Sequence, residues 1–151
     1  MPSITPFLWF DTQAEEAMNF YASIFKRSKV ISVSRVQGKV MSVQFELEGQ
    51  RFMALNAGPL YKFTEAISFF VGCDTQQEID DLWAKLSAGS GEPGRCGWLK
   101  DKFGLSWQIV PSALSRMLGD KDGAKSKRAV DAMLQMNKLD IARLQQAFDG
   151  A

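Results

Sequence analysis

The chain has 151 residues, of which 46% are hydrophobic, and this is enough for one domain with a substantial core. Its 18 Lys and Arg residues nearly balance 17 Asp and Glu residues, which excludes the strongly basic surface typical of nucleic-acid or anionic-membrane binding. Histidine is absent, which excludes imidazole metal sites and Ser-His or Cys-His catalytic pairs but leaves an all-oxygen Mg²⁺ or Ca²⁺ site open.

The first half of the chain predicts a strand, a helix and a three-strand meander. Residues 4–10 are a short aromatic and aliphatic run, which is typical of a strand. Apolar residues recur at helical spacing over residues 13–26, and residues 11–13 offer side chains that could cap this helix. The strands predicted for the meander are residues 30–36, 40–47 and 52–56.

The same order of elements then begins again. Residues 66–71 predict a strand, and a helix follows from residue 74 to about residue 86. The tripeptide Asp-Thr-Gln occurs at residues 11–13 and again at residues 74–76, each time after a Phe-rich strand. An aromatic residue, Phe20 or Trp83, lies nine positions after each Asp. These coincidences indicate an internal duplication.

The remaining elements complete the second copy and add a tail. Short strands are predicted at residues 97–100 and 105–110, and the missing strand would have to lie within residues 89–96. Three amphipathic helices are then expected to pack onto the sheet or onto another subunit, at residues 113–118, 124–136 and 140–148, with Asp122 and Asp140 near their caps. We expect one domain, with module one at 3–57, module two at 65–111 and a helical tail at 112–151.

Residues 89–94, Gly-Ser-Gly-Glu-Pro-Gly, formally match the dinucleotide-binding pattern Gly-x-Gly-x-x-Gly. That pattern functions after a strand and at the start of a helix, whereas this segment follows a predicted helix and precedes a strand. The segment is therefore interpreted as a loop. No Gly-rich loop follows the first strand, so no recognisable adenosylmethionine motif is present.

The two cysteines, Cys73 and Cys96, do not form a disulfide framework and suit a reducing compartment. Residues 1–6 lack the basic and apolar regions of a signal peptide, and no apolar run is long enough to cross a bilayer. We therefore expect a cytoplasmic protein. Cys96 is either a nucleophile whose thiolate is stabilised by Lys100 or Lys102, or a partly buried inert thiol.

Six segments together resemble one known family. They are residues 4–10, residues 15–17 with 20–21, residues 55–59, residues 96–104, residues 106–109 and, in the tail, residues 133–136 with 140–141. They are similar to the PhnB-like, 3-demethylubiquinone-9 3-methyltransferase-like branch of the vicinal-oxygen-chelate (glyoxalase/bleomycin resistance/dioxygenase) superfamily. The resemblance implies an α+β fold in which two βαβββ modules form a half-open, mostly antiparallel curved sheet around a small-molecule cavity, with C-terminal helices added.

The resemblance also implies where a metal would bind. Metal-dependent relatives place His and Glu ligands on the first and last strands of each module. The corresponding positions in this chain hold Pro6, either Ala66 or Ser68, and the amide Gln108, while Asn56 occupies or adjoins the remaining one. Such side chains are poor Zn²⁺ or Fe²⁺ ligands. The resemblance therefore implies a protein with no metal and no cofactor.

The aromatic residues are expected to lie mostly in the core, with Phe10, Phe70 and Trp98 nearest a pocket for a planar or apolar ligand. Gln108 either orients that ligand or is a satisfied polar side chain within the sheet. The predicted ligand-binding residues are Phe10, Asn56, Ser68, Phe70, Cys96, Trp98 and Gln108.

These features favour a metal-free, homodimeric protein that binds a small organic molecule and neither nucleic acid nor membrane. One alternative is an isomerase or lyase whose base is Glu46, Glu65 or Asp101. Another is the methyltransferase activity that the name of the branch implies. A third hypothesis is an interaction protein whose tail helices bind another chain.

Overall fold

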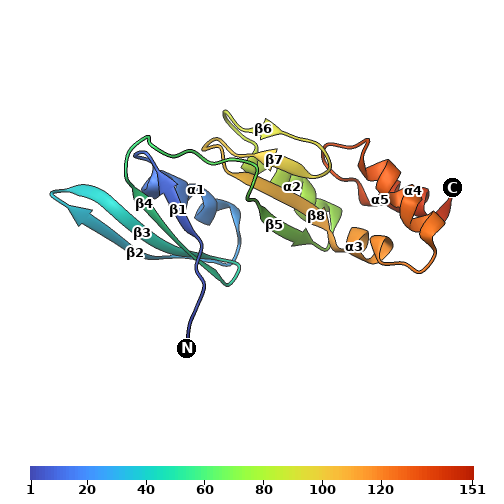
Figure 1. The fold of residues 1–151 in the computed structure, drawn as a ribbon, viewed down its shortest axis with the longest axis horizontal. Coiled ribbons are helices and arrows are strands. Elements are labelled where there is room, and N and C mark those ends of the chain that lie inside the picture. The colour runs from blue at the N-terminus through green and yellow to red at the C-terminus, as the bar shows by residue number, and fades with distance from the viewer. The chain divides into compact units, whose positions relative to one another are not determined.

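The order strand, helix and three strands occurs twice along the chain (Figure 1). A computed structural model describes residues 1–151 as two units, Met1–Lys62 (unit 1) and Phe63–Ala151 (unit 2). Unit 1 contains β1 (Phe7–Phe10), α1 (Ala14–Ile24), β2 (Ser28–Val36), β3 (Lys39–Leu47) and β4 (Gln50–Asn56). Unit 2 contains β5 (Phe69–Cys73), α2 (Gln76–Leu86), β6 (Glu92–Pro93), β7 (Trp98–Lys100), β8 (Ser106–Pro111), α3 (Ser112–Leu118), α4 (Gly123–Met133) and α5 (Ile141–Asp149).

Each unit forms one open four-stranded sheet of the same topology. The strand orders are β1-β4-β3-β2 and β5-β8-β7-β6, and in each the first strand pairs in parallel with the last. The other pairs are antiparallel. A parallel pair needs a crossover connection, and α1 and α2 begin the two crossovers. The predicted α+β class with duplicated βαβββ modules is confirmed.

The strand registers also show the duplication at single-residue level. Phe7 pairs with Met53 in unit 1, and Phe70 pairs with Gln108 in unit 2. Phe7 and Phe70 each lie four residues before the Asp of the repeated tripeptide. Met53 is therefore the counterpart of Gln108. By the same count, Asn56, which pairs with Phe10, is the counterpart of Pro111.

The core of unit 1 lies between its sheet and α1. Met18 and Tyr21 of α1 are each 1% exposed, and Tyr21 stacks on Phe45, which stacks in turn on Phe52. Strand residues alternate between two faces. The strand residues that share a face with Phe45 and Phe52 therefore point toward α1, and the residues between them point away from it. Burial of each such side chain contributes about 1.5–3 kcal/mol.

The N-terminus of α1 is capped by a residue distant in sequence. Asn56 Oδ1 accepts a hydrogen bond from Ala14 N at 2.8 Å, and Asn56 Nδ2 donates to Val40 O at 3.2 Å. No side chain caps the helix locally, so the prediction of a cap within residues 11–13 is wrong. In unit 2 the counterpart Pro111 has no such acceptor, and Thr75 Oγ1 accepts from Glu78 N instead.

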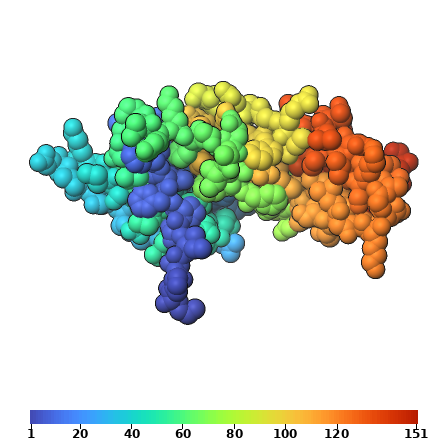
Figure 2. Space-filling model, viewed as in Figure 1, coloured from blue at the N-terminus to red at the C-terminus, as the bar shows by residue number.

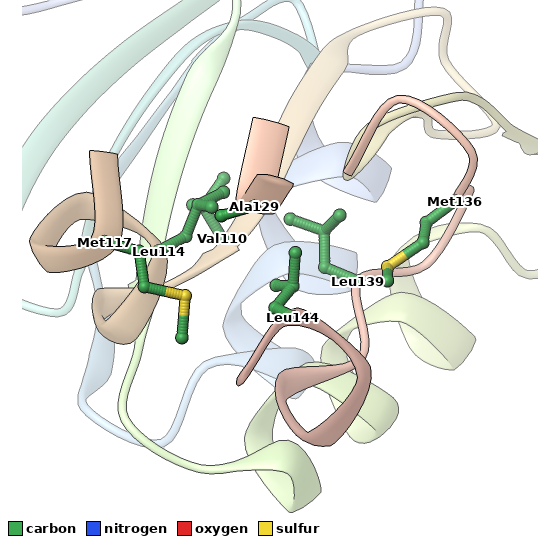
Figure 3. Packing of buried hydrophobic residues seen from close by; sticks show 7 residues of the cluster. All are labelled: Val110, Leu114, Met117, Ala129, Met136, Leu139 and Leu144. Atoms are coloured by element: carbon green, nitrogen blue, oxygen red, sulfur yellow. The ribbon is translucent and has the colours of Figure 1, made fainter. Parts of the chain in front are cut away.

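Within unit 2, the helical tail packs against the end of β8 through a buried apolar cluster (Figure 3). Its members are Val110, Leu114, Met117, Ala129, Met136, Leu139 and Leu144. The segment before α5 also pairs with the turn before β7, since Cys96 N donates to Met136 O and Gly97 N donates to Asn137 O, both at 2.8 Å. Gly97 has φ +85°, and a Cβ there would lie 2.8 Å from Ile109 O. Only glycine suits this close approach.

Gln76, the first residue of α2, fixes the start of α5. Its Nε2 donates to Leu139 O at 3.1 Å and its Oε1 accepts from Ile141 N at 2.8 Å. Asp122 and Asp140 cap α4 and α5, as predicted. None of the helices has the length and hydrophobicity that a bilayer crossing requires.

Two predicted strands begin later than expected. The residues before Phe7 project from unit 1 as an arm (Figure 2), and Ile4 is 95% exposed. The first backbone bond to the sheet joins Met53 N to Pro6 O, so the earlier residues have no strand beside them. Likewise, Ala66 and Ser68 lie outside β5. The strand expected within residues 89–96 is present as the two-residue β6 (Glu92–Pro93), so the interpretation of residues 89–94 as a loop is wrong at these two residues, which pair with β7.

We predict that Asn56→Ala destabilises the protein by about 1–2 kcal/mol, because the first amide of α1 and the Val40 carbonyl both lose a partner. Urea denaturation measures this difference. The control is Asn19→Ala on the exposed surface of α1, which should change stability by less than about 0.5 kcal/mol. Equal effects of the two substitutions would contradict the cap.

Candidate functional site

The sheet of unit 2 has one face covered by α2 and an opposite face that remains partly exposed. Trp107 and Ile109 of β8 and Leu99 of β7 are at most 2% exposed and form the covered face with α2. Residues between them in sequence point the other way. On that opposite face Gln108 lies beside Phe70 of β5 and Trp98 of β7, its two partners in the sheet register.

A hydrogen bond fixes the position of the Gln108 side chain on this face. Gln108 Nε2 donates to Ser68 Oγ at 2.9 Å, across 40 residues of sequence. The Phe70 ring beside it is 59% exposed. The pair and its two aromatic neighbours therefore combine apolar surface with an amide oxygen, Gln108 Oε1, whose position is set by the Ser68 contact. Four of the seven predicted ligand-binding residues lie together here, and we call them the Gln108 face: Ser68, Phe70, Trp98 and Gln108.

The other three predicted residues have different surroundings. Phe10 is 4% exposed in the core of unit 1, where its neighbour Trp9 takes the opposite face. Asn56 caps α1 and borders an open hollow of about 590 Å³. Cys96 is a free, half-buried thiol in the turn that pairs with the tail. Their roles in ligand binding stay predictions.

The residues at the expected metal positions do not fit a transition-metal site. The sheet registers place the thioether of Met53, not Asn56, at the position that corresponds to Gln108. The Asn56 amide is already engaged in two hydrogen bonds, and Gln108 is a neutral amide. No three His, Cys, Asp or Glu side chains are grouped so that they could hold a metal ion. No chemical step through a metal follows from these residues.

Asp101, one of the predicted catalytic carboxylates, has a structural role. It is 2% exposed, and its Oδ1 accepts hydrogen bonds from Phe103 N at 2.9 Å and Leu105 N at 3.1 Å. Its Oδ2 accepts from Trp107 Nε1 at 2.9 Å. These bonds close the turn between β7 and β8 and leave little capacity for a substrate.

Glu65, a second predicted carboxylate, forms an ion pair with Lys100 of β7. The hydrogen bond from the Lys100 ammonium lowers the pKa of Glu65, and the same bond raises the pKa of Lys100. A carboxylate held in its charged form is a weaker base. Glu46, the third, lies opposite Arg51 in the ladder of β3 and β4 and is grouped with no other catalytic candidate.

A small hollow of about 140 Å³ adjoins the Gln108 face. Its wall includes Glu65, Glu92, Trp98, Lys100 and Ser106. Ser106 is 1% exposed, and its Oγ has no hydrogen-bond partner. A buried hydroxyl without a partner costs about 1–3 kcal/mol. Ser106 is not among the ligand-binding residues predicted from the sequence. The one available signal was its place two residues before Gln108, on the same face of β8.

Comparisons with known proteins agree with this fold and give it a family. The model of the family described as 3-demethylubiquinone-9 3-methyltransferase matches residues 2–110. The chain belongs to this family. Within the family, the PhnB protein from Bacillus cereus is 38% identical, and the match covers 74% of this chain and 100% of that one with a TM-score of 0.67. The expected PhnB-like branch of the glyoxalase/bleomycin resistance superfamily is thereby confirmed.

More distant structures share the fold alone. Protein PA1353 from Pseudomonas aeruginosa is 18% identical over 74% of this chain and 98% of its own, with a TM-score of 0.60. The fosfomycin resistance protein FosX from Listeria monocytogenes, in complex with Mn(II) and sulfate, is 13% identical over 72% of this chain and 91% of its own, with a TM-score of 0.55. No curated protein matches the sequence.

The family match ends at residue 110, just before α3. The three tail helices therefore lie outside the part of the chain that defines the family. Unit 2 carries these helices in addition to the shared module, and they bury Val110 at the end of its sheet.

We predict that Asp101→Ala destabilises the protein by about 2–3 kcal/mol, because three donors lose their acceptor inside the fold. Urea denaturation provides the measurement. Asp81→Ala, an exposed aspartate of α2, is the matched control and should change stability by less than about 0.5 kcal/mol. If Asp101→Ala is as stable as the control, the carboxylate is not structural.

The two cysteines should differ in reactivity. Cys73 is fully buried, and this burial, with smaller contributions from Glu78 and Asp74, raises the pKa of its thiol from 9.0 to about 11. A thiol reagent at pH 8 should label Cys96 in the folded protein and Cys73 only after denaturation. Rapid labelling of both thiols in the folded state would contradict this assignment.

The raised pKa of Cys73 also predicts a pH dependence of stability. The protonated thiol favours the folded state, so its contribution is complete below about pH 9 and is lost as the pH rises toward 11. Unfolding free energies of the wild type and Cys73→Ala, measured across this window, should show a steeper decline for the wild type. Parallel declines would exclude a contribution from Cys73.

Proposed function

We propose that this protein binds a small organic molecule on the Gln108 face of unit 2, without a metal ion. The observation that carries the proposal is the Ser68–Gln108 hydrogen bond, which holds a polar amide between two aromatic side chains on a face that α2 leaves uncovered. Binding sites for small molecules combine apolar and aromatic walls with a few fixed polar groups. The Gln108 face has this composition.

The geometry favours a planar ligand with a hydrogen-bond donor. The exposed Phe70 ring offers an apolar surface, and Trp98 flanks Gln108 on the other side. Ser68 already accepts from Gln108 Nε2, so Gln108 Oε1 is the atom that remains to accept a bond from the ligand. A ligand that carries a hydrogen-bond donor next to a planar ring could therefore contact Phe70 and donate to Gln108 Oε1 at the same time.

The proposal includes a cytoplasmic homodimer with no nucleic-acid or membrane partner. The near balance of 18 basic and 17 acidic residues and the two free cysteines support this. Leu60 and Tyr61 of unit 1 are 72% and 62% exposed, which favours association with a second copy. Light scattering of the purified protein measures its oligomeric state, and a monomer at all concentrations would exclude the dimer.

The metal-free part of the proposal is tested by native mass spectrometry and elemental analysis of the purified protein. Stoichiometric, tightly held Zn, Ni, Fe or Mn would refute it. Calorimetry with adenosylmethionine tests the activity for which the family is named. Clear binding heat would favour a methyltransferase and contradict a simple binding function.

We predict that Phe70→Ala weakens binding of benzamide, whose ring and amide match the Gln108 face, by about tenfold. Chemical shifts in an NMR titration give the dissociation constant, expected on the order of 1 mM for so small a probe. The matched control is Phe7→Ala, the counterpart in unit 1, which is 52% exposed beside Met53 instead of Gln108. If the control weakens binding equally, or if benzamide does not bind, the Gln108 face is not the site.

A further inference from the structure

The hollow beside the Gln108 face is a second candidate binding site. It has a volume of about 140 Å³, and the buried Ser106 hydroxyl forms part of its wall with no hydrogen-bond partner. A hydroxyl has one donor and two acceptor positions, and all of them are unused at Ser106. An occupant with polar hydrogens would supply the missing partner.

The charges around the hollow favour a cation. Lys100 is already paired with Glu65, and Glu92 is the register partner of Lys100 in the ladder of β6 and β7. Two carboxylates therefore meet one ammonium group, which leaves one negative charge in excess. Trp98 forms another part of the wall. Aromatic rings attract cations electrostatically, so the wall and the charges favour the same kind of ligand.

The donor set separates an organic cation from a metal ion. Two carboxylates and one hydroxyl offer at most five oxygens, fewer than the six to eight ligands of Ca²⁺, and the Glu65 carboxylate is already paired with Lys100. A primary ammonium group has three N–H donors, and the hollow offers three acceptors in Glu65, Glu92 and Ser106. An anion would have to displace Glu65 from Lys100 and would still face Glu92.

The size of the hollow limits what it can hold. Sites for whole drug-sized ligands occupy about 300–1,000 Å³, so this one accommodates only the end of a molecule. Ser106 precedes Gln108 by two residues on β8, a distance of about 6.6 Å along the strand. A ligand with its end in the hollow would therefore extend over Trp98 toward Gln108.

The loop that borders the hollow is shaped by Gly94. Its N–H donates to Trp98 O at 2.8 Å, and a Cβ at this position would lie 2.7 Å from the same oxygen. The glycine thus lets β6 approach β7 and places Glu92 opposite Lys100. The Gly-rich segment that resembles a dinucleotide motif forms one wall of this hollow instead.

From these observations we infer that the hollow binds the primary ammonium end of the ligand. The group would donate to Ser106 Oγ, Glu65 and Glu92 beside the Trp98 ring. This inference rests on the proposed function, because the body of the ligand would lie on the Gln108 face. The ligand class is accordingly a planar or apolar molecule with a primary amine at one end.

Titrations of the full chain at pH 7, followed by NMR, test the inference with benzylamine, benzyl alcohol and benzyltrimethylammonium. Benzylamine should shift the signals of Ser106 and Trp98 and bind about tenfold more tightly than the other two probes. The alcohol lacks the charge, and the trimethylammonium probe lacks the N–H donors. Equal affinity of the three probes would overturn the inference.

Two variants locate the binding energy. Ser106→Ala and Glu92→Gln should each weaken benzylamine binding by about three- to tenfold. Both should fold, because Ser106 Oγ makes no hydrogen bond and Glu92 is exposed. Glu46→Gln, on a strand of unit 1, is the control and should bind like the wild type. Wild-type affinity in both site variants would overturn the inference.

The benzamide titration separates this inference from the proposed function. If benzamide binds at Phe70 and Gln108, while benzylamine binds no more tightly than the other two probes and does not shift the Ser106 signal, the ammonium site is absent. In that case the proposed binding on the Gln108 face is retained. If neither probe affects the Gln108 face or the hollow, both conclusions fail.

Discussion

The parallel pairing of the first strand with the last is the constraint on which each unit depends. A parallel pair requires the chain to cross over, and the helix that begins the crossover covers one face of the sheet. In unit 2 this arrangement leaves the face of Gln108 uncovered by α2. The same pairing sets Phe70 beside Gln108, so the proposed site is a direct result of the register.

The duplication preserves the backbone and changes the chemistry. Met53 and Gln108 occupy the same place in the two registers, as do Asn56 and Pro111. In unit 1 the side-chain amide of Asn56 caps a helix. In unit 2 the side-chain amide is that of Gln108, which lies three residues before Pro111, the counterpart of Asn56, on the face that α2 leaves uncovered. One topology therefore supports a structural amide in one unit and a candidate recognition group in the other.

Hydrogen-bond satisfaction separates structural polar groups from candidate binding groups in unit 2. Asp101 and Ser106 are both almost fully buried, but Asp101 accepts three hydrogen bonds and Ser106 Oγ has none. In the folded protein Asp101 already accepts hydrogen bonds from its own chain, whereas the Ser106 hydroxyl remains available to a ligand. Sequence patterns treat both simply as polar residues near a turn, so they cannot make this distinction.

The sequence by itself determined the element order, the duplication and the caps of α4 and α5, because these depend on local periodicity and neighbouring residues. Tertiary structure decided that Asn56 caps α1, that Phe10 lies in the core and that Ser106 borders a hollow. Alternation along a strand defines two faces but does not say which one a helix covers. Partners 40 or more residues apart, such as Ser68 and Gln108, meet only when the strands align.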